Sequence, residues 1–160
     1  MEAYLLLGSN IGDRRKNIEN ALLAIGEKNK IVKVSSLYET ESYGYKDQPY
    51  FINCCCKIET KFSPRELLIF VKEIEKKMGR KNGIRWGPRN IDIDILFYSN
   101  IVINEKDLII PHYDLANRKF VLICLSEIAP YFVHPVLKKT VKEMFDEIKD
   151  LCSCTLLKES

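Results

Sequence analysis

The sequence predicts an α+β fold in which helices cover both faces of a mostly antiparallel sheet. Short apolar runs typical of strands alternate with amphipathic helical patterns in the order β-α-β-β-α-β. No internal repeat or low-complexity linker interrupts the 160 residues. This order is typical of a ferredoxin-like core, so we expect a three-layer α-β-α fold. We expect residues 1–160 to form one domain, with the tail from about residue 151 left unassigned.

The composition is that of a globular protein with mixed charge. Hydrophobic residues make up 46% and charged residues 29%, and the formal net charge is +3. So small a charge gives no argument for nucleic-acid binding. No apolar run is long enough to cross a membrane and the N-terminus does not resemble a signal peptide, so we expect a cytoplasmic protein without membrane contact. Cys54–Cys56 are consecutive in a strand-like run, and we expect free thiols rather than a metal site.

The first half of the chain is expected to contain three strands and one helix. Residues 3–7 form a short apolar strand before a glycine-containing turn, and residues 14–28 carry apolar side chains at helical spacing. Further strands are expected at residues 31–38 and 50–60. The polar segment 39–49 between them is too long for a tight hairpin, and loops of this kind are often functional.

The second helix carries the clearest local signals. Ser63 is a strong N-cap residue, Pro64 suits the first helical position, and Glu66 completes a capping box. An apolar stripe continues from there, and Gly79 is expected to end the helix.

The last third is expected to contain strands and one further helix. After a strand near residues 91–98, residues 101–103 are expected to return as a hairpin, and residues 120–124 to form another strand. An amphipathic helix is expected at about residues 140–149. We interpret His134 as a structural histidine, because a lone histidine usually is.

Residues 85–98, which read R-W-G-P-R-N-I-D-I-D-I-L-F-Y, carry the strongest functional signal. Alternation with isoleucines puts Asp92 and Asp94 on one face of a strand, roughly 6 to 7 Å apart. Two such carboxylates repel each other, and Mg²⁺ is the simplest partner because it takes oxygen ligands and shares them with phosphates. Arg85 and Arg89 around Trp86 suggest a polyphosphate clamp. The same pattern also fits an exposed strand with two solvated acids.

The run R-W-G-P-R-N-I-D-I-D-I-L resembles the signature of the 6-hydroxymethyl-7,8-dihydropterin pyrophosphokinase family of the folate pathway. Members of that family move a pyrophosphoryl group from ATP to the hydroxymethyl oxygen of a reduced pterin. The resemblance extends from Tyr4 to about Pro135 and includes the run P-H-Y-D at residues 111–114. It implies ATP as co-substrate, two Mg²⁺ ions and a reduced pterin as the second substrate. We further expect a monomer that binds no nucleic acid.

The resemblance also assigns roles to individual residues. It implies that Asp92 and Asp94 hold the metal ions and that the catalytic set is Arg80, Arg85, Arg89, Asp92 and Asp94. The implied ATP contacts are Leu68, Glu75, Arg80, Trp86, Arg89, Ile95, His112, Tyr113 and Arg118. The implied pterin contacts are Thr40, Tyr43, Phe51, Asn53, Trp86, Asp92 and Phe120, with the two phenylalanines on either side of the ring. Glu75 would otherwise be a solvated acid near a helix end.

The chain departs from the family pattern at two places. Glu41 and Ser42 stand where many relatives have prolines, and Asp107 and Ile109 stand where a basic residue and a threonine are frequent. The first pair lies in the expected pterin loop and the second on the expected adenine side.

Two alternatives remain open from the sequence. A nucleic-acid-binding module could use the same basic loop, with Trp86 stacking on bases, but Asp92 and Asp94 would repel a phosphate backbone in the absence of a metal. A pyrophosphokinase with another acceptor is the second alternative, and only the resemblance at Phe51, Asn53 and Phe120 favours a pterin.

Overall fold

The computed structural model describes residues 1–40, 50–80, 90–149 and 154–157, without the side chain of Arg80. Its main sheet has six strands in the order β5-β1-β4-β3-β8, with β2 paired to β4. Every strand pair in it is antiparallel. The strands are β1 (Glu2–Ser9), β2 (Lys30–Val34), β3 (Tyr38–Thr40), β4 (Phe51–Glu59), β5 (Asp92–Tyr98) and β8 (Cys154–Leu156).

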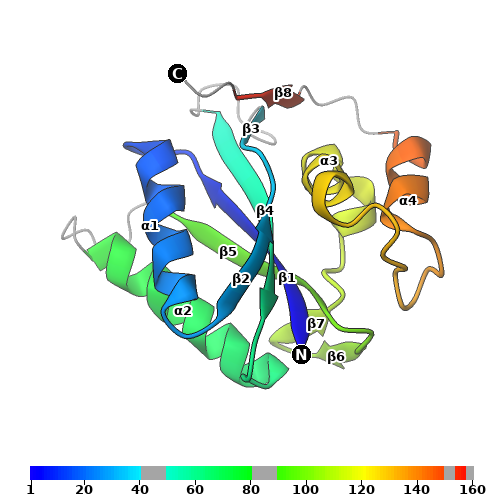
Figure 1. Cartoon of the computed structure of the whole chain (residues 1–160), viewed down its shortest axis with the longest axis horizontal. Helices are drawn as coiled ribbons and strands as arrows, with labels where there is room; N and C mark the ends of the chain where they lie inside the picture. Colours follow the sequence, from blue (N-terminus) through cyan, green and yellow to red (C-terminus); the bar gives the residue numbers. More distant parts are fainter. Residues whose placement is uncertain (41–49, 81–89, 150–153, 158–160) are drawn as a thin grey trace.

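Helices cover both faces of this sheet (Figure 1). On one face lie α1 (Arg14–Gly26) and α2 (Pro64–Arg80), and on the other lie the 3-10 helix η1 (Leu115–Asn117), α3 (Lys119–Ile128) and α4 (Val141–Glu147). Each face has its own hydrophobic core. The expected three-layer α+β fold with a ferredoxin-like strand order is confirmed.

The consecutive cysteines follow the pleat of β4. Cys54 and Cys56 belong to the core beneath α1 and α2, whereas Cys55 belongs to the core beneath α3. Burial raises the pKa of the Cys56 thiol to about 12 and raises the pKa values of the other two as well. The three thiols therefore stay protonated at neutral pH and act as small apolar core residues.

The predicted strand at residues 120–124 is wrong, because this segment lies within the helix α3. Its run F-V-L-I-C is apolar at every position, and such a run fits a buried strand or a buried helix equally well. In the structure the helix is buried on more than one side, with Val121, Leu122, Cys124 and Leu125 all at 1% exposure or less. Periodicity could not separate the two possibilities.

Three further boundaries differ from the prediction. The strand expected at residues 31–38 is divided into β2 and β3, and at the break Ser35 Oγ accepts a hydrogen bond from Cys55 N at 2.9 Å. Residues 101–103 do not pair back on β5. Instead β6 (Ile103–Glu105) pairs with β7 (Leu108–Ile110) in a separate two-stranded sheet. The tail adds β8 to the main sheet beside β3.

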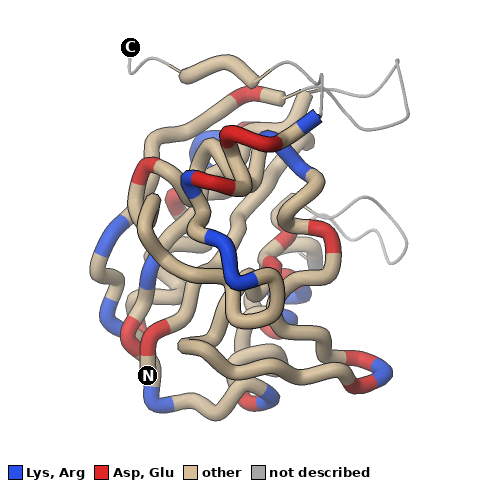
Figure 2. Tube along the Cα trace, turned by 90° about the vertical axis from the view of Figure 1, so that its right-hand side faces the viewer, with Lys and Arg blue, Asp and Glu red and all other residues tan. Residues whose placement is uncertain are grey.

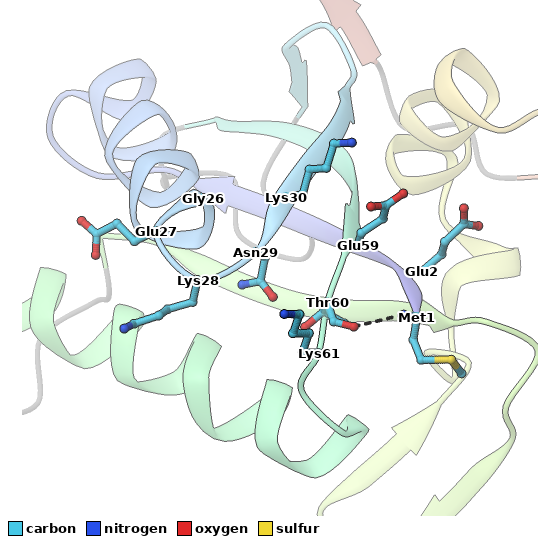
Figure 3. A pocket seen from close by; sticks show the side chains of 10 residues that line it. All are labelled: Met1, Glu2, Gly26, Glu27, Lys28, Asn29, Lys30, Glu59, Thr60 and Lys61. Atoms are coloured by element: carbon cyan, nitrogen blue, oxygen red, sulfur yellow. Dashed lines mark hydrogen bonds between the residues drawn. The ribbon is translucent and has the colours of Figure 1, made fainter.

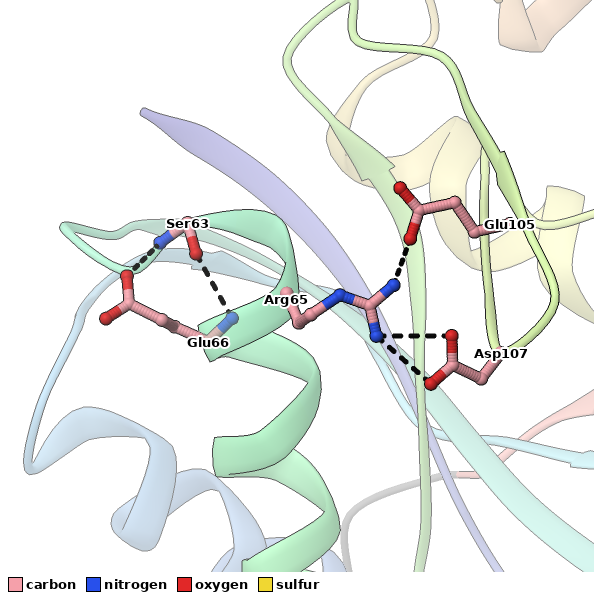
Figure 4. A network of polar contacts seen from close by, with 5 residues as sticks. All are labelled: Ser63, Arg65, Glu66, Glu105 and Asp107. Atoms are coloured by element: carbon pink, nitrogen blue, oxygen red, sulfur yellow. Dashed lines mark hydrogen bonds and ion pairs between the residues drawn. The ribbon is translucent and has the colours of Figure 1, made fainter.

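The start of α2 follows its sequence signals, as Figure 4 shows. Ser63 Oγ accepts from Glu66 N at 3.2 Å, and Glu66 Oε1 accepts from Ser63 N at 2.9 Å, which completes the predicted capping box. In the same turn, Arg65 pairs with Asp107 at 3.0 Å and also with Glu105, and these contacts connect the helix to the β6–β7 sheet. These pairs are solvent-exposed and screened by water, so we expect them to contribute little to stability.

The end of α2 differs from the prediction, because the helix continues through Gly79 to Arg80. A glycine that ends a helix commonly does so by turning the chain through positive φ, and Gly12 is the positive-φ glycine among the described residues. The carbonyl of Met78 instead accepts a hydrogen bond from Asn90 Nδ2 at 3.2 Å. A side chain from beyond the helix thus satisfies this end.

His134 is structural, as the sequence suggested. Its Nδ1 accepts hydrogen bonds from Val136 N at 3.1 Å and Leu137 N at 3.0 Å, and its ring meets Phe97 edge-on. Burial lowers the pKa of this imidazole below its usual value. A proton on Nδ1 would also remove both hydrogen bonds.

We therefore expect the folded protein to lose stability in mild acid. Because the unfolded chain binds a proton near pH 6.5 and folded His134 resists it, the free energy of unfolding should fall as the pH drops below about 6.5. Urea denaturation at pH 7.5 and pH 5.5 measures this. The drop should be smaller in His134→Asn, which keeps an acceptor near the position of Nδ1. The chain has two histidines, and His112→Asn reports the share of the other. An unchanged drop in His134→Asn would contradict the assignment.

Basic and acidic residues are interspersed along the described part of the trace (Figure 2). None of the described helices is both long and apolar enough to span a bilayer.

Candidate active site

Three neighbouring strands bring the carboxylate and the amide of the predicted site to one end of the sheet. Gly8 on β1 pairs with Asp92 on β5 and, on its other side, with Asn53 on β4. The row Asp92–Gly8–Asn53 therefore crosses three neighbouring strands, and its ends are about 10 Å apart at Cα. Asp92 and Asp94 point away from Ile93 and Ile95, which lie in the core beneath α1 and α2. The site faces the α3 side of the sheet.

Asp92 and Asp94 lie on the edge strand β5, and a third carboxylate, that of Glu75, is hydrogen-bonded to the backbone of this strand. Asp92 and Asp94 are both half-buried, and β5 ends the strand order of the sheet. The amide of Ile93, between them, donates to Glu75 Oε2 at 3.0 Å. Glu75 is 3% exposed and pairs with Lys72 at 3.0 Å, so its interpretation as a solvated acid is wrong.

His112 lies beside the same edge of β5. Its backbone N donates to Leu96 O at 3.0 Å, and its Nδ1 accepts from Asp114 N at 3.2 Å. Because that nitrogen is an acceptor, the neutral ring carries its proton on Nε2. Burial lowers the pKa of His112, nearby Asp94 raises it, and Arg118 lowers it. The imidazole is thus a neutral donor close to the Asp94 carboxylate.

Asp114 fixes the arginine of this cluster. Its Oδ2 accepts from Arg118 Nε at 2.7 Å and its Oδ1 from Asn117 Nδ2 at 3.1 Å. Hydrogen bonds from Asn117 and Arg118 lower the pKa of Asp114, so the carboxylate stays ionised. The guanidinium of Arg118 also lies 5.9 Å from the ring centroid of Phe120. Arg118 is therefore placed by an ion pair and a cation–π contact together.

The amide side of the site is built by β3 and β4. Asn53 Nδ2 donates to Thr40 Oγ1 at 2.9 Å, and both residues are 3% exposed. Phe51 pairs with Thr40 in the strand register and is half-buried, as is Phe120 at the start of α3. A flat ligand with a mixed donor and acceptor edge suits such an amide with aromatic neighbours.

Some of the remaining predicted residues lie within the described part of the chain, and others lie outside it. Leu68 of α2 and Ile95 of β5 belong to the core between the sheet and the helices α1 and α2, on the face of the sheet opposite the site. Tyr113 is exposed, and its ring stacks on that of His112 with the ring centroids 4.9 Å apart. Arg80 is the last residue of α2. Four other predicted residues lie outside the described residues, namely Tyr43, Arg85, Trp86 and Arg89.

Sequence reasoning missed two residues of this site. Asp114 was quoted only as part of P-H-Y-D, although its position four residues before Arg118 is a pairing signal. Gly8 was interpreted as a turn residue, and no local pattern reveals that a neighbouring strand brings Asn53 against it.

A cavity of about 650 Å³ opens at the other end of the sheet, where β1 begins and β4 ends (Figure 3). Its lining holds three lysines and three glutamates, a balance that gives no reason to expect an anion there. We therefore assign the site from the chemistry of Asp92, Asp94 and Asn53. The cavity is lined by Met1, Glu2, Gly26, Glu27, Lys28, Asn29, Lys30, Glu59, Thr60 and Lys61.

The chain is similar to known proteins along most of its length. It is 43% identical over 155 residues to the 2-amino-4-hydroxy-6-hydroxymethyldihydropteridine pyrophosphokinase of Aquifex aeolicus, covering 97% of each chain. It is 45% identical over 141 residues to a folic acid synthesis protein of Dictyostelium discoideum, of which it spans only 22%. The solved structure of wild-type HPPK-DHPS from Plasmodium falciparum with pteroate is 20% identical, with a TM-score of 0.74. That match covers 91% of this chain and 44% of the other, and it supports the fold alone.

The sequence also matches a defined protein family over residues 4–130, which is most of the chain. The match includes the strand with Asp92 and Asp94, the strand with Asn53, and the P-H-Y-D run. The family is described as 7,8-dihydro-6-hydroxymethylpterin-pyrophosphokinase. The chain therefore belongs to the 7,8-dihydro-6-hydroxymethylpterin-pyrophosphokinase (HPPK) family.

Proposed function

We propose that this chain transfers the pyrophosphoryl group of ATP to the hydroxymethyl oxygen of 6-hydroxymethyl-7,8-dihydropterin, as a step of folate biosynthesis. Family membership supports the reaction. The structural observation that carries it is the row Asp92–Gly8–Asn53, because it holds a carboxylate and a buried amide about 10 Å apart on one face. We propose that residues 1–160 act as one domain.

The two aspartates fit a magnesium site that depends on the nucleotide. Among the described residues, no group of three or more His, Cys, Asp or Glu side chains is arranged to hold a metal ion. A carboxylate pair suits Mg²⁺, which is usually bound by one or two carboxylates and completes its coordination shell with phosphate oxygens and water. Asp92 and Asp94 would hold two such ions with the phosphates of ATP. When bound, Mg²⁺ supplies neutralisation of the phosphate charge.

The reaction needs alignment rather than a covalent intermediate. The pterin hydroxyl releases its proton to solvent and its oxygen bonds to the β-phosphorus of ATP, while the bond between that phosphorus and the α–β bridging oxygen breaks. AMP leaves with the electron pair of that bond. Positioning and electrostatics dominate such transfers.

The chain supplies donors around the path of the phosphates. His112, with its proton on Nε2, and Arg118, held by Asp114, would bind phosphate oxygens next to Asp94. We also propose that four residues whose side chains lie outside those described contact the substrates, namely Arg80, Arg85, Trp86 and Arg89.

The position of β5 at the sheet edge bears on the nucleotide. Because an edge strand is open on one side, a ligand that lies along it can contact side chains from both faces. ATP would then contact Leu68, Glu75 and Ile95 on the α2 side while its phosphates meet Asp94 on the α3 side. Tyr113 would contribute from the segment after β7.

The pterin would bind at the amide side of the row. Phe51 and Phe120 would lie against the two faces of the ring, and Asn53 would bond its edge. Thr40, Tyr43, Trp86 and Asp92 complete the proposed contacts.

Product analysis tests the proposal directly. The protein is incubated with ATP, MgCl₂ and 6-hydroxymethyl-7,8-dihydropterin, and nucleotides and pterins are separated by ion-exchange chromatography. AMP and a pterin diphosphate in equal amounts are expected. ADP with a pterin monophosphate would mean simple phosphoryl transfer. No turnover of this pterin, with Mg-ATP still bound, would mean another acceptor.

A further inference from the structure

Gly8 occupies the middle of the row that joins the two halves of the site. Its register partners are Asp92 on one side and Asn53 on the other. Tyr4 and Leu6, which share its face of β1, reach the core beneath α3, so Gly8 faces the same side as the site. A larger residue here would place its side chain between the carboxylate and the amide.

The backbone does not require glycine at this position. Gly12 is the glycine with positive φ among the described residues, whereas Gly8 is an ordinary paired strand residue. Glycine weakens a strand because it adds no packing and loses more conformational entropy on folding. Its presence in a central strand therefore calls for another reason, such as close approach of another group.

Asn53 makes that close approach. A Cβ added to Gly8 would lie 2.7 Å from Asn53 Oδ1, closer than real Cβ atoms come to an oxygen, and 3.6 Å from Phe51 Cδ1. On the other side of β4, Asn53 Nδ2 donates to buried Thr40 at 2.9 Å. The carboxamide therefore lies across β4 with its oxygen over Gly8 and its nitrogen toward Thr40.

This orientation decides what the amide offers to a ligand. An asparagine amide has two N–H groups and one carbonyl oxygen, and Thr40 takes one N–H. The other N–H and the carbonyl oxygen remain available to a ligand, and the hydrogen bond to Thr40 fixes the direction in which they point. A bound ring must then present an acceptor and a donor in matching positions, which is how a buried amide discriminates strongly between related molecules.

We propose that Gly8 is a specificity-determining positioning residue, whose missing side chain lets the Asn53 carboxamide lie in the orientation that recognises the heterocyclic acceptor. This inference rests on the proposed function for the identity of that acceptor. Gly8 acts through Asn53 and does not itself touch the reacting atoms. Because the nearest atoms to the added Cβ all belong to Asn53 and Phe51, the nucleotide side is left unchanged.

A double-mutant cycle tests the inference. Affinity for 6-hydroxymethyl-7,8-dihydropterin is measured by calorimetry with saturating Mg²⁺ and α,β-methylene-ATP, which prevents turnover, in wild type, Gly8→Ala, Asn53→Ala and the double variant. Gly8→Ala should weaken pterin binding at least about tenfold, the loss of one well-placed hydrogen bond. The double variant should bind like Asn53→Ala within about twofold, because the group that clashes is gone. Affinity for the ATP analogue should change less than about twofold.

A second readout does not depend on the substrate. The side-chain ¹⁵N–¹H resonances of Asn53 should shift in Gly8→Ala and stay in place in Gly26→Ala, where an added Cβ meets only Ile31 at an ordinary 3.6 Å. Unmoved resonances, unchanged pterin affinity in Gly8→Ala, or losses that add in the double variant would each overturn the inference. If the wild-type protein does not bind this pterin but the Asn53 resonances still shift in Gly8→Ala, the proposed function would be overturned and the positioning role would stand.

Discussion

Asp94→Asn should lower the turnover number by about 10³-fold while leaving the fold intact. The substitution keeps the size of the side chain but removes the charge that would hold Mg²⁺ and the ATP phosphates, and such a site contributes several kcal/mol to the transition state. Asp94 is half-buried with no core role, since its face of β5 looks toward the site. Steady-state rates of AMP release measure the effect.

The dependence on magnesium separates this effect from a general loss of activity. Asp94→Asn should need a higher Mg²⁺ concentration for half-maximal rate, because one ligand has lost its charge. The matched control is Asp146→Asn, the same change at an exposed position on α4, which should keep wild-type rates. Turnover of Asp94→Asn within threefold of wild type would refute the metal-binding role.

Glu75→Leu should lower the free energy of unfolding by about 2 kcal/mol. The substitution removes the acceptor of the Ile93 amide, and an unpaired buried donor costs about 1–3 kcal/mol. The ion pair with Lys72 is lost as well, but Lys72 is itself 43% exposed and can return to water. Urea denaturation followed by circular dichroism measures the change.

Two comparisons show which property of Glu75 matters. Glu75→Gln keeps an acceptor oxygen, so it should lose less than half as much stability as Glu75→Leu. Glu73→Leu, the same change at an exposed position of α2, should stay within about 0.5 kcal/mol of wild type. Equal losses in Glu75→Gln and Glu75→Leu would mean that the charge, and not the hydrogen bond to β5, supports the edge strand.

The support by Glu75 also bears on catalysis. Ile93 lies between the two aspartates and donates its amide hydrogen to Glu75. If this hydrogen bond is lost and β5 shifts, the carboxylates of Asp92 and Asp94 would shift with it. We expect Glu75→Leu to lower turnover more than Glu75→Gln does.

Local chemistry alone determined much of this protein. Alternation in the D-x-D strand predicted which side chains point into the core, and the Ser63–Glu66 capping box was predicted from residues three apart. The resemblance of the same strand and of P-H-Y-D to one family correctly identified the family. Such signals survive because the interacting groups are neighbours in the chain.

Tertiary structure decided the rest. The apolar run of α3 is buried on several sides, so its periodicity did not reveal a helix, and α2 continues past Gly79 while Asn90 Nδ2 donates to Met78 O from beyond the helix. Glu75 is buried at the edge of β5, where it accepts from Ile93 N, and the amide oxygen of Asn53, 45 positions away, lies close to where a side chain at Gly8 would begin. Each of these outcomes depends on groups that only folding brings together, so a pattern within one segment carries no trace of them.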